Sequence, residues 1–386
     1  MTRAGWQSSW EGLVAEASPA PARRLLRAGL SAAAVPFGLF LAAKGGTYRL
    51  GLRRACRLPV PVLVVGNLTL GGTGKTTATQ HLVRRLAGRG ARAGVISRGY
   101  GGHAHNGPVV VSDGTRVLST VHECGDEALL LARSLPGHPV AAARRREAAG
   151  RAVLATLKDP TGAPTGEPVR AFVVDDGFQY LRLHRDADIL LVDASRPFLA
   201  DHLFPAGRLR EPRRNATRAS QIWITHCEVA ADAAVQQLAA WASATLGGQP
   251  PVLTAHAPAG ARLLAGPPLD GDLRGERVLA LSALGAPASF EACLAQDGCE
   301  VRPLRYPDHH CYAPPDWERI GAAQRDCRAA WIATTEKDAV KLTPPPPDVG
   351  PVAVLGCELQ IVEGEQQVER LLDEALSCAA SEPKGR

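Results

Sequence analysis

The residues with the clearest chemical potential lie in a glycine-rich segment in the first quarter of the chain. Gly71-Gly72-Thr73-Gly74 is followed at once by Lys75 and Thr76. Glycines let backbone N–H groups approach phosphate oxygens, and a helix that starts there adds the positive end of its dipole. A lysine at this place reaches the outer phosphates, and a threonine hydroxyl can bind Mg²⁺. The predicted nucleotide-binding residues are Thr69, Leu70, Gly71, Gly72, Thr73, Gly74, Lys75 and Thr76.

The flanking residues predict the strand and the helix that such a loop needs. Residues 60–65 form a short, apolar, β-branched run, which is typical of a buried strand in a parallel sheet. Residues 77–86 continue with a helical pattern. The strict G-x-x-x-x-G-K-[ST] pattern fails at its first glycine, where Thr69 stands. The alternative, a glycine-rich turn of a Rossmann-like fold, leaves the Lys-Thr pair at a helix start unexplained.

Two pairs of adjacent carboxylates can supply metal ligands or a base. Asp175 and Asp176 end an apolar run, which delivers a carboxylate to the sheet edge where Mg²⁺ would lie opposite Thr76. Asp126 and Glu127 stand where a helix is predicted to begin. Taken alone, the first pair is explained as a surface turn and the second as a helix cap. The phosphate loop upstream favours metal binding for Asp175 and Asp176.

Two further segments combine charged and titratable side chains. A rigid loop between Pro205 and Pro212 carries Arg210 and Glu211. In the second half of the chain, His309 and His310 follow an aspartate, a combination that suits proton transfer or metal binding.

Buried runs alternate with helical segments along most of the chain, which indicates an α/β fold built on a parallel sheet. A Gly/Pro-rich stretch over 246–251 marks a boundary. We therefore expect a membrane-associating segment over 1–55, a P-loop domain over 56–250 and a smaller α/β domain over 251–386. Further strands are predicted at 92–97, 170–174, 187–193, 221–225, 277–282, 300–305, 330–333 and 351–355.

The N-terminal segment combines an apolar stretch with basic flanks. Its uninterrupted apolar part, 29–43, is shorter than the ~20 residues of a spanning helix and contains Pro36. Arginines precede it, and basic residues continue after it from Lys44 to Arg57. This pattern predicts an interfacial or re-entrant anchor on an anionic membrane leaflet. The alternatives are a helix of a soluble core and a signal peptide, and a site for cytosolic nucleotide downstream argues against export.

Composition limits the partners without choosing one. The net charge of +6 suits nucleic acid, an anionic membrane surface or a phosphorylated substrate. No nucleic-acid recognition motif accompanies the charge, so no nucleic-acid partner is expected. The nine cysteines include no C-x-x-C pair and indicate reduced thiols in a cytosolic compartment.

Taken in order, these segments resemble the tetraacyldisaccharide 4′-kinase family, the lipid A 4′-kinases of Gram-negative bacteria. The resemblance extends over roughly residues 10–345. It departs from the family at Thr77, where a proline is usual, at Ala283, where a turn glycine is usual, and over 159–168, an apparent insertion. The matching pieces are Val65-Gly-Asn-Leu-Thr-Leu-Gly-Gly-Thr-Gly-Lys-Thr76, Ser97-Arg-Gly-Tyr-Gly101, Gly125-Asp-Glu127, Val174-Asp-Asp-Gly-Phe-Gln179, Pro205-Ala-Gly-Arg-Leu-Arg-Glu-Pro212, Pro307-Asp-His-His310 and Thr334-Thr-Glu-Lys-Asp338.

The resemblance implies a P-loop kinase that transfers the γ-phosphate of ATP to the 4′-hydroxyl of a tetraacylated glucosamine disaccharide 1-phosphate. It implies work at the cytoplasmic face of the inner membrane, with Asp126 as base, assisted by His309 or His310. Lys75 and Arg210 would neutralise phosphate charge, and Arg98 or an arginine of 144–146 would meet the 1-phosphate. The implied Mg²⁺ ligands are Thr76, Glu127, Asp175, Asp176 and Glu211. A monomer is expected.

Two other classes remain open at this point. A deviant-Walker ATPase fits the Gly-Gly-Thr-Gly-Lys-Thr-Thr run, but such ATPases usually carry a lysine where this chain has Leu70. A membrane-surface protein that uses nucleotide as a switch fits the N-terminus and the P-loop. It leaves the four carboxylates and two histidines unexplained.

Overall fold

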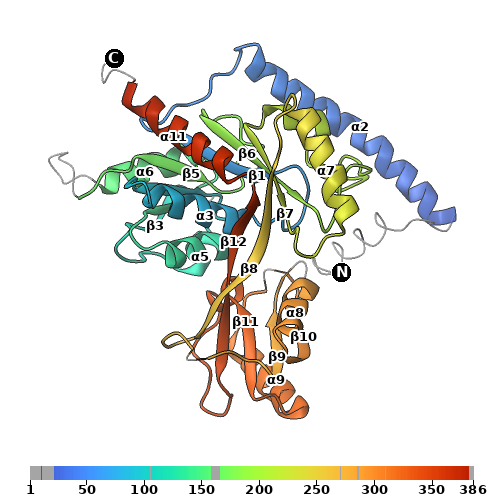
Figure 1. The fold of residues 1–386 in the computed structure, drawn as a ribbon, viewed down its shortest axis with the longest axis vertical. Helices are drawn as coiled ribbons and strands as arrows, with labels where there is room; N and C mark the ends of the chain where they lie inside the picture. Colours follow the sequence, from blue (N-terminus) through green and yellow to red (C-terminus); the bar gives the residue numbers. More distant parts are fainter. Residues whose placement is uncertain are drawn as a thin grey trace.

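A single sheet of twelve strands runs through the molecule (Figure 1). The structure is a computed structural model that describes residues 10, 21–104, 106–157, 166–269, 271–284, 287–308 and 310–381, without the side chains of 21–23, 289 and 378–381. The strand order is β10-β9-β11-β12-β8-β7-β6-β1-β5-β2-β4-β3. The strands are β1 Val62–Asn67, β2 Ala93–Ser97, β3 Val109–Ser112, β4 Val140–Ala142, β5 Ala171–Val174, β6 Ala187–Asp193, β7 Gln221–Thr225, β8 Val252–Leu263, β9 Arg277–Ser282, β10 Glu300–Arg305, β11 Trp331–Thr335 and β12 Val352–Glu363.

Helices cover both faces of the strands around β1. Alternate residues of β1 point to opposite faces, so that Leu63 and Val65 pack with α3 and α5, whereas Val62 and Val64 pack with α6. All six residues of β1 are buried, as expected for a central parallel strand. The helices are α2 Pro21–Arg49, α3 Lys75–Ala87, α4 Val121–Cys124, α5 Asp126–Ser134, α6 Arg146–Thr156, η1 Arg213–Arg218, α7 Asp232–Thr245, α8 Pro287–Gln296, α9 Pro314–Cys327, α10 Glu336–Ala339 and α11 Glu365–Ser381.

Two long antiparallel strands join the two parts of the molecule. β8 leaves the P-loop part beside β7, and β12 returns beside β8 (Figure 1). After β12, α11 packs back on α3, where Arg89 Nε lies 3.0 Å from Asp373 Oδ1. Residues 365–381 therefore lie with the P-loop part, although they follow the C-terminal strands in sequence.

The predicted fold class is confirmed. Four strands have the predicted bounds, namely β6, β7, β9 and β10. β8 and most of β12 were not predicted from the sequence, because both strands are only partly buried and contain glycine or proline. The expected insertion over 159–168 lies mostly outside the described residues.

The N-terminal segment forms one continuous helix. α2 has 29 residues, with Pro36 inside it, and is longer than the apolar run suggested. Its segment 24–49 is long and apolar enough to cross a membrane by length and composition, and only 6% of its most apolar window is buried. The alternative of a soluble core helix is therefore wrong. α2 touches the body through Phe37, whose ring lies 6.0 Å from that of Phe204.

Candidate active site

The phosphate loop joins the end of β1 to the start of α3. Gly71 has a φ of 110° and Gly74 a φ of 75°, values that residues with a Cβ rarely adopt. Leu70 N donates to Arg208 O at 2.8 Å, which ties the loop to the Pro205–Pro212 segment. Gly72 is exposed, with open space where a side chain would lie. The loop thus presents backbone N–H groups and the start of α3 on an accessible surface, as a phosphate site requires.

Lys75 and Arg210 converge on Asp176. Lys75 Nζ lies 3.7 Å from Asp176 Oδ1, and Arg210 Nη1 donates to both carboxylate oxygens at 2.9 and 3.1 Å. Burial opposes ionisation of this carboxyl, but Lys75 and Arg210 outweigh it and hold the pKa of Asp176 at about 2. The sequence prediction placed all three residues in one site, and the structure brings them together.

Asp175 precedes Asp176 in the chain, and its side chain faces other carboxylates. Thr79 Oγ1 donates to Asp175 Oδ1 at 3.3 Å from the second turn of α3. Burial, followed by the charges of Glu127 and Asp176, raises the pKa of Asp175 well above its usual range. Crowded carboxylates that raise each other's pKa are stabilised by a divalent cation, and carboxylate and hydroxyl oxygens are the ligands that Mg²⁺ prefers. Asp175, Glu127 and the neighbouring Asp176 therefore fit a Mg²⁺ site.

Asp126 opens α5 and faces the C-terminal part. Gly125 precedes it with a φ of 83°, and a Cβ there would overlap the Tyr100 carbonyl oxygen, so only glycine fits this turn. Lys341 Nζ lies 4.0 Å from Asp126 Oδ2 and 2.8 Å from Asp338 Oδ1. Lys341 thus lies between a carboxylate of the P-loop part and one of the C-terminal part.

The structure describes one of the two predicted histidines. His309 lies outside the described residues. His310 Nε2 lies 3.0 Å from Asp316 Oδ2, and its ring packs against Tyr306 and Tyr312. The described contacts therefore place His310 in an aromatic cluster at the start of α9.

Glu211 is engaged within its own loop. Its Oε2 accepts hydrogen bonds from Asn215 Nδ2 at 2.6 Å and Arg218 Nη1 at 2.8 Å. Arg218 also donates to Phe178 O, two residues after Asp176. These contacts show Glu211 holding the loop that carries Arg210.

Several groups near the site were missed or misjudged at the level of sequence. Arg146 is buried, lies over the Tyr180 ring and donates to Asp176 O at 3.4 Å, whereas Arg144 and Arg145 are exposed. Thr79 carried no signal beyond its helical spacing from Lys75. Lys341 follows the Thr-Thr-Glu-Lys-Asp motif, but its approach to Asp126 depends on the fold.

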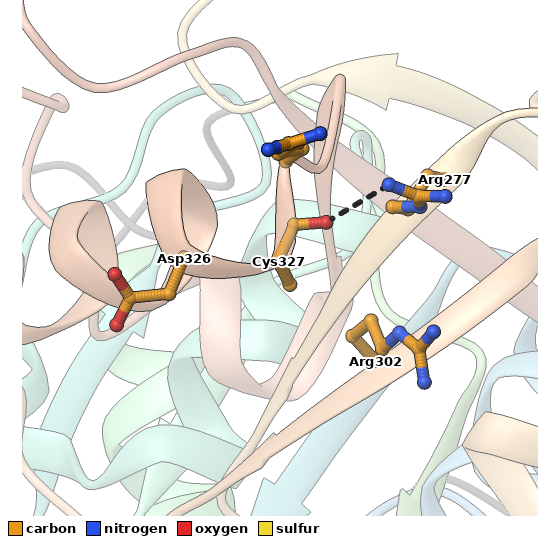
Figure 2. A pocket seen from close by; sticks show the side chains of 5 residues that line it. Arg277, Arg302, Asp326 and Cys327 are labelled. Carbon is orange, nitrogen blue, oxygen red and sulfur yellow. Dashed lines mark hydrogen bonds between the residues drawn. The ribbon is translucent and has the colours of Figure 1, made fainter.

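A separate pocket lies at the other end of the C-terminal strands (Figure 2). Arg277 and Arg302 are at or near the amino ends of β9 and β10, whereas Asp338 follows the carboxyl end of β11. Both arginines pair with Glu300, at 2.8 and 2.9 Å. This pocket is therefore not continuous with the predicted site. Its lining residues are Arg277, Arg302, Asp326, Cys327 and Arg328.

Comparisons with known proteins agree with the resemblance. The family model described as tetraacyldisaccharide-1-P 4′-kinase matches residues 26–377. A tetraacyldisaccharide 4′-kinase of Anaeromyxobacter dehalogenans strain 2CP-1 is 39% identical over 366 residues, covering 93% of each chain. One of Geobacter metallireducens is 36% identical, covering 92% of this chain and 99% of its own.

A solved structure supports the same conclusion at the level of the fold. The crystal structure of LpxK from Aquifex aeolicus in complex with ATP has a TM-score of 0.72 and 28% sequence identity. It covers 91% of this chain and 99% of its own. The P-loop, the carboxylates around it and these matches over nearly the whole length show that the chain belongs to the tetraacyldisaccharide-1-P 4′-kinase family.

Proposed function

We propose that this chain is an ATP-dependent lipid kinase of lipid A biosynthesis. It transfers the γ-phosphate of ATP to the 4′-hydroxyl of a tetraacylated glucosamine disaccharide 1-phosphate. The observation that carries the proposal is the convergence of Lys75, Arg210 and Asp176 beside a glycine-rich loop, within a chain that matches this kinase family throughout.

The phosphates of ATP are held by the loop and its cations. Backbone N–H groups of residues 71–76 bind the β- and γ-phosphates, and Lys75 and Arg210 turn from Asp176 towards the transferring phosphoryl group. Thr76, Glu127, Asp175 and Asp176 would hold Mg²⁺, which neutralises the charge on the phosphate oxygens when bound. Glu211 supports Arg210 through the loop contacts with Asn215 and Arg218.

Asp126 is the base for the acceptor hydroxyl. A bond forms between the 4′-oxygen and the γ-phosphorus, the bond to the β–γ bridging oxygen breaks, and the hydroxyl proton passes to Asp126. Lys341 Nζ, 4.0 Å from Asp126 Oδ2, orients that carboxylate before the transfer. His309 or His310 is proposed to assist in orienting the base, and ADP leaves.

The protein binds its glycolipid substrate at a membrane surface. α2 exposes Leu39 and Phe40 at 67% and 63%, and basic residues flank its apolar stretch at both ends. An exposed apolar helix with basic flanks favours the acyl region and anionic headgroups of a leaflet. Because ATP is the phosphate donor, the proposed location is the cytoplasmic face of the inner membrane. α2 contacts Phe204, just before the Pro205–Pro212 loop, so the anchor and Arg210 lie on connected segments.

The test is direct phosphorylation of the lipid. Purified protein in detergent is incubated with γ-labelled ATP, Mg²⁺ and the tetraacyl disaccharide 1-phosphate, with Lys75→Ala as the reference of strongly reduced activity. Label at the 4′ position is the expected result. ATP hydrolysis that proceeds without lipid labelling would instead support an ATPase.

A further inference from the structure

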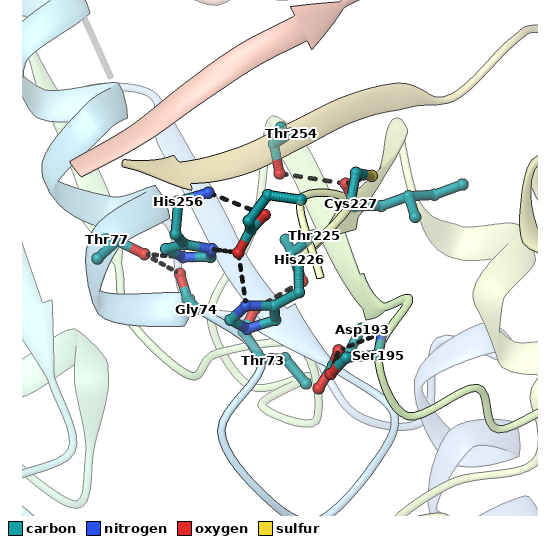
Figure 3. Close-up of polar contacts among 12 residues, drawn as sticks. Thr73, Gly74, Thr77, Asp193, Ser195, Thr225, His226, Cys227, Thr254 and His256 are labelled. Carbon is teal, nitrogen blue, oxygen red and sulfur yellow. Dashed lines mark hydrogen bonds and ion pairs between the residues drawn. The ribbon is translucent and has the colours of Figure 1, made fainter. Parts of the chain in front are cut away.

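A cluster of three ligand-type side chains lies on the other side of the phosphate loop from Asp176. His226 and Glu228 follow β7, and His256 lies in β8. Figure 3 shows the two imidazoles stacked beside Gly74 and Thr77, with ring centroids 4.3 Å apart. One ring nitrogen of each histidine and a carboxylate oxygen of Glu228 lie within 4.8 Å of one another. None of these groups has a place in the phosphoryl transfer proposed above.

Hydrogen bonds select the tautomer of His256. Thr77 Oγ1 donates its proton to Gly74 O at 2.8 Å and lies 2.9 Å from His256 Nε2. Because the hydroxyl proton is committed to Gly74, His256 Nε2 carries the proton of the second contact and donates it to Thr77. His256 Nδ1 is then an unprotonated lone pair.

That lone pair is buried opposite a negative charge. His256 Nδ1 is buried without a hydrogen-bond partner among the described residues, and it lies 3.9 Å from Glu228 Oε1. The carboxylate is held there because His256 N donates to Glu228 Oε2 at 3.1 Å. A lone pair facing a carboxylate oxygen is unfavourable unless a cation lies between them.

His226 completes the set of ligands. Its backbone adopts a left-handed conformation, with a φ of 60°, which is rare for a residue with a side chain. This conformation directs His226 Nδ1 to within 3.6 Å of Glu228 Oε1. A strained backbone that brings a second histidine nitrogen to the same carboxylate indicates a ligand-binding role for His226.

We propose that His226, Glu228 and His256 bind one divalent transition-metal ion of the Zn²⁺ class. In a tetrahedral site with metal–ligand bonds of about 2.0–2.1 Å, neighbouring ligand atoms lie roughly 3.3 Å apart. The separations of 3.6 and 3.9 Å would shrink by roughly 0.3 and 0.6 Å to reach this geometry. The two stacked rings, now 20° from parallel, would also turn so that each Nδ1 lone pair points at the ion in its ring plane. Two imidazoles favour Zn²⁺ or Co²⁺ over Mg²⁺, so this site differs from the carboxylate site at Asp175.

The ion would fix the nucleotide loop from behind. The ion would link the segment after β7 to β8. Because His256 contacts Thr77, this link would also restrict the movement of the phosphate loop at Gly74. Thr77 is a positioning residue for the metal site, because a ligating histidine is oriented by the hydrogen bond of its other ring nitrogen. A Cβ on Gly74 would lie 2.7 Å from His256 Nε2, so the loop and the cluster are in close contact.

Metal binding is tested on the full-length protein, carrying no histidine tag and treated with chelator. Titration with Co²⁺ should give one equivalent of binding, with visible d–d absorption of tetrahedral type that one equivalent of Zn²⁺ abolishes. His256→Gln and Glu228→Gln should each lose this signal. The exposed His122→Gln is the matched control and should retain it.

Thr77→Val tests the proposed orientation of His256. It keeps all three ligands but removes the partner of Nε2, and should weaken Co²⁺ affinity about 10–100-fold. Thermal unfolding in chelator shows whether each variant is folded, so that lost binding is not lost structure. The proposal is overturned if the wild type binds no stoichiometric Co²⁺, or if folded His256→Gln and Glu228→Gln still bind it. Lipid phosphorylation is measured separately, so either proposal can fail alone.

Discussion

The two candidate carboxylates, Asp176 and Asp126, differ in where their partners come from. Asp176 meets Lys75 and Arg210, which belong to the same P-loop part of the chain. Asp126 meets Lys341, which belongs to the C-terminal part and is itself paired with Asp338. The proposed phosphate site is thus formed within one part, whereas the proposed base has neighbours from both parts. Variants of the two groups should therefore separate nucleotide affinity from turnover.

The largest expected effect is on Asp126, whose charged neighbour Lys341 comes from the other part of the chain. Asp126→Asn keeps the shape of the side chain and removes its ability to accept the hydroxyl proton. Turnover should fall about 10²–10⁴-fold, the usual contribution of a general base, with ATP affinity nearly unchanged. Single-turnover lipid phosphorylation and ATP binding by calorimetry measure the two quantities.

Asp326→Asn, an exposed aspartate of the separate pocket, is the control and should leave both quantities unchanged. An equal loss of ATP affinity and turnover in Asp126→Asn would place Asp126 in nucleotide binding, and the contrast with Asp176 would disappear.

Lys75→Ala tests the proposed phosphate site, whose residues all belong to the P-loop part. Removing this cation should lower turnover about 10²–10³-fold, because it stabilises charge on the transferring phosphoryl group. In contrast to Asp126→Asn, ATP affinity should fall as well. The same binding and labelling measurements apply, and turnover equal to that of the wild type would exclude the kinase mechanism.

Lys341→Met tests whether the C-terminal part acts on the base. Its side chain is 3% exposed and 4.0 Å from Asp126, so turnover should fall about tenfold, equivalent to about 1.4 kcal/mol. Single-turnover lipid phosphorylation should show this loss, while ATP affinity measured by calorimetry stays nearly unchanged. Unchanged turnover in a folded Lys341→Met would show that the C-terminal part does not act on Asp126.

Stability must be followed in the same variant. Lys341 and Asp338 form a buried pair, and breaking such a pair costs about 3–5 kcal/mol. The melting temperature of Lys341→Met should therefore fall, and activity is compared well below it. Lys341→Arg keeps the charge and should restore turnover at least in part.

Only the site within the P-loop part could be predicted in full from the sequence. The Lys75, Asp175 and Asp176 site was predictable, because each residue ends or begins an element whose hydrophobic pattern is unambiguous, and parallel strands bring those ends to one edge. Asp126 and Lys341 are 215 positions apart in sequence and meet only because β8 and β12 bring the second part back. Those strands are only partly buried over most of their length and carry Pro258, Gly260 and Gly356, so their length was not evident.

Substitutions in α2 test whether this helix brings the protein to the membrane that holds the lipid acceptor. They change neither Asp126 nor Asp176. Leu39→Glu with Phe40→Glu removes two exposed apolar side chains, each contributing about 1.5–3 kcal/mol when buried in a leaflet. Binding to vesicles with anionic lipid should weaken more than about tenfold, while ATP binding stays intact. Val362→Glu, an equally exposed site on β12, is the matched control. Unchanged sedimentation with vesicles in the double variant would place the membrane contact elsewhere.

The smallest effect is expected at the proposed Mg²⁺ site. Thr79 Oγ1 holds Asp175 at 3.3 Å, and Thr79→Val removes that hydrogen bond at nearly constant volume. A net loss of about 1 kcal/mol corresponds to about a fivefold higher Mg²⁺ concentration for half-maximal turnover. Thr245→Val on α7, which loses a hydrogen bond to Trp241 O, should leave the Mg²⁺ dependence unchanged. Because the hydrogen bond of Thr79 to Asp175 lies within the P-loop part, Lys341→Met should not reproduce this Mg²⁺ shift. If it does, the two carboxylates share one cation, and the division between the phosphate site and the base is wrong.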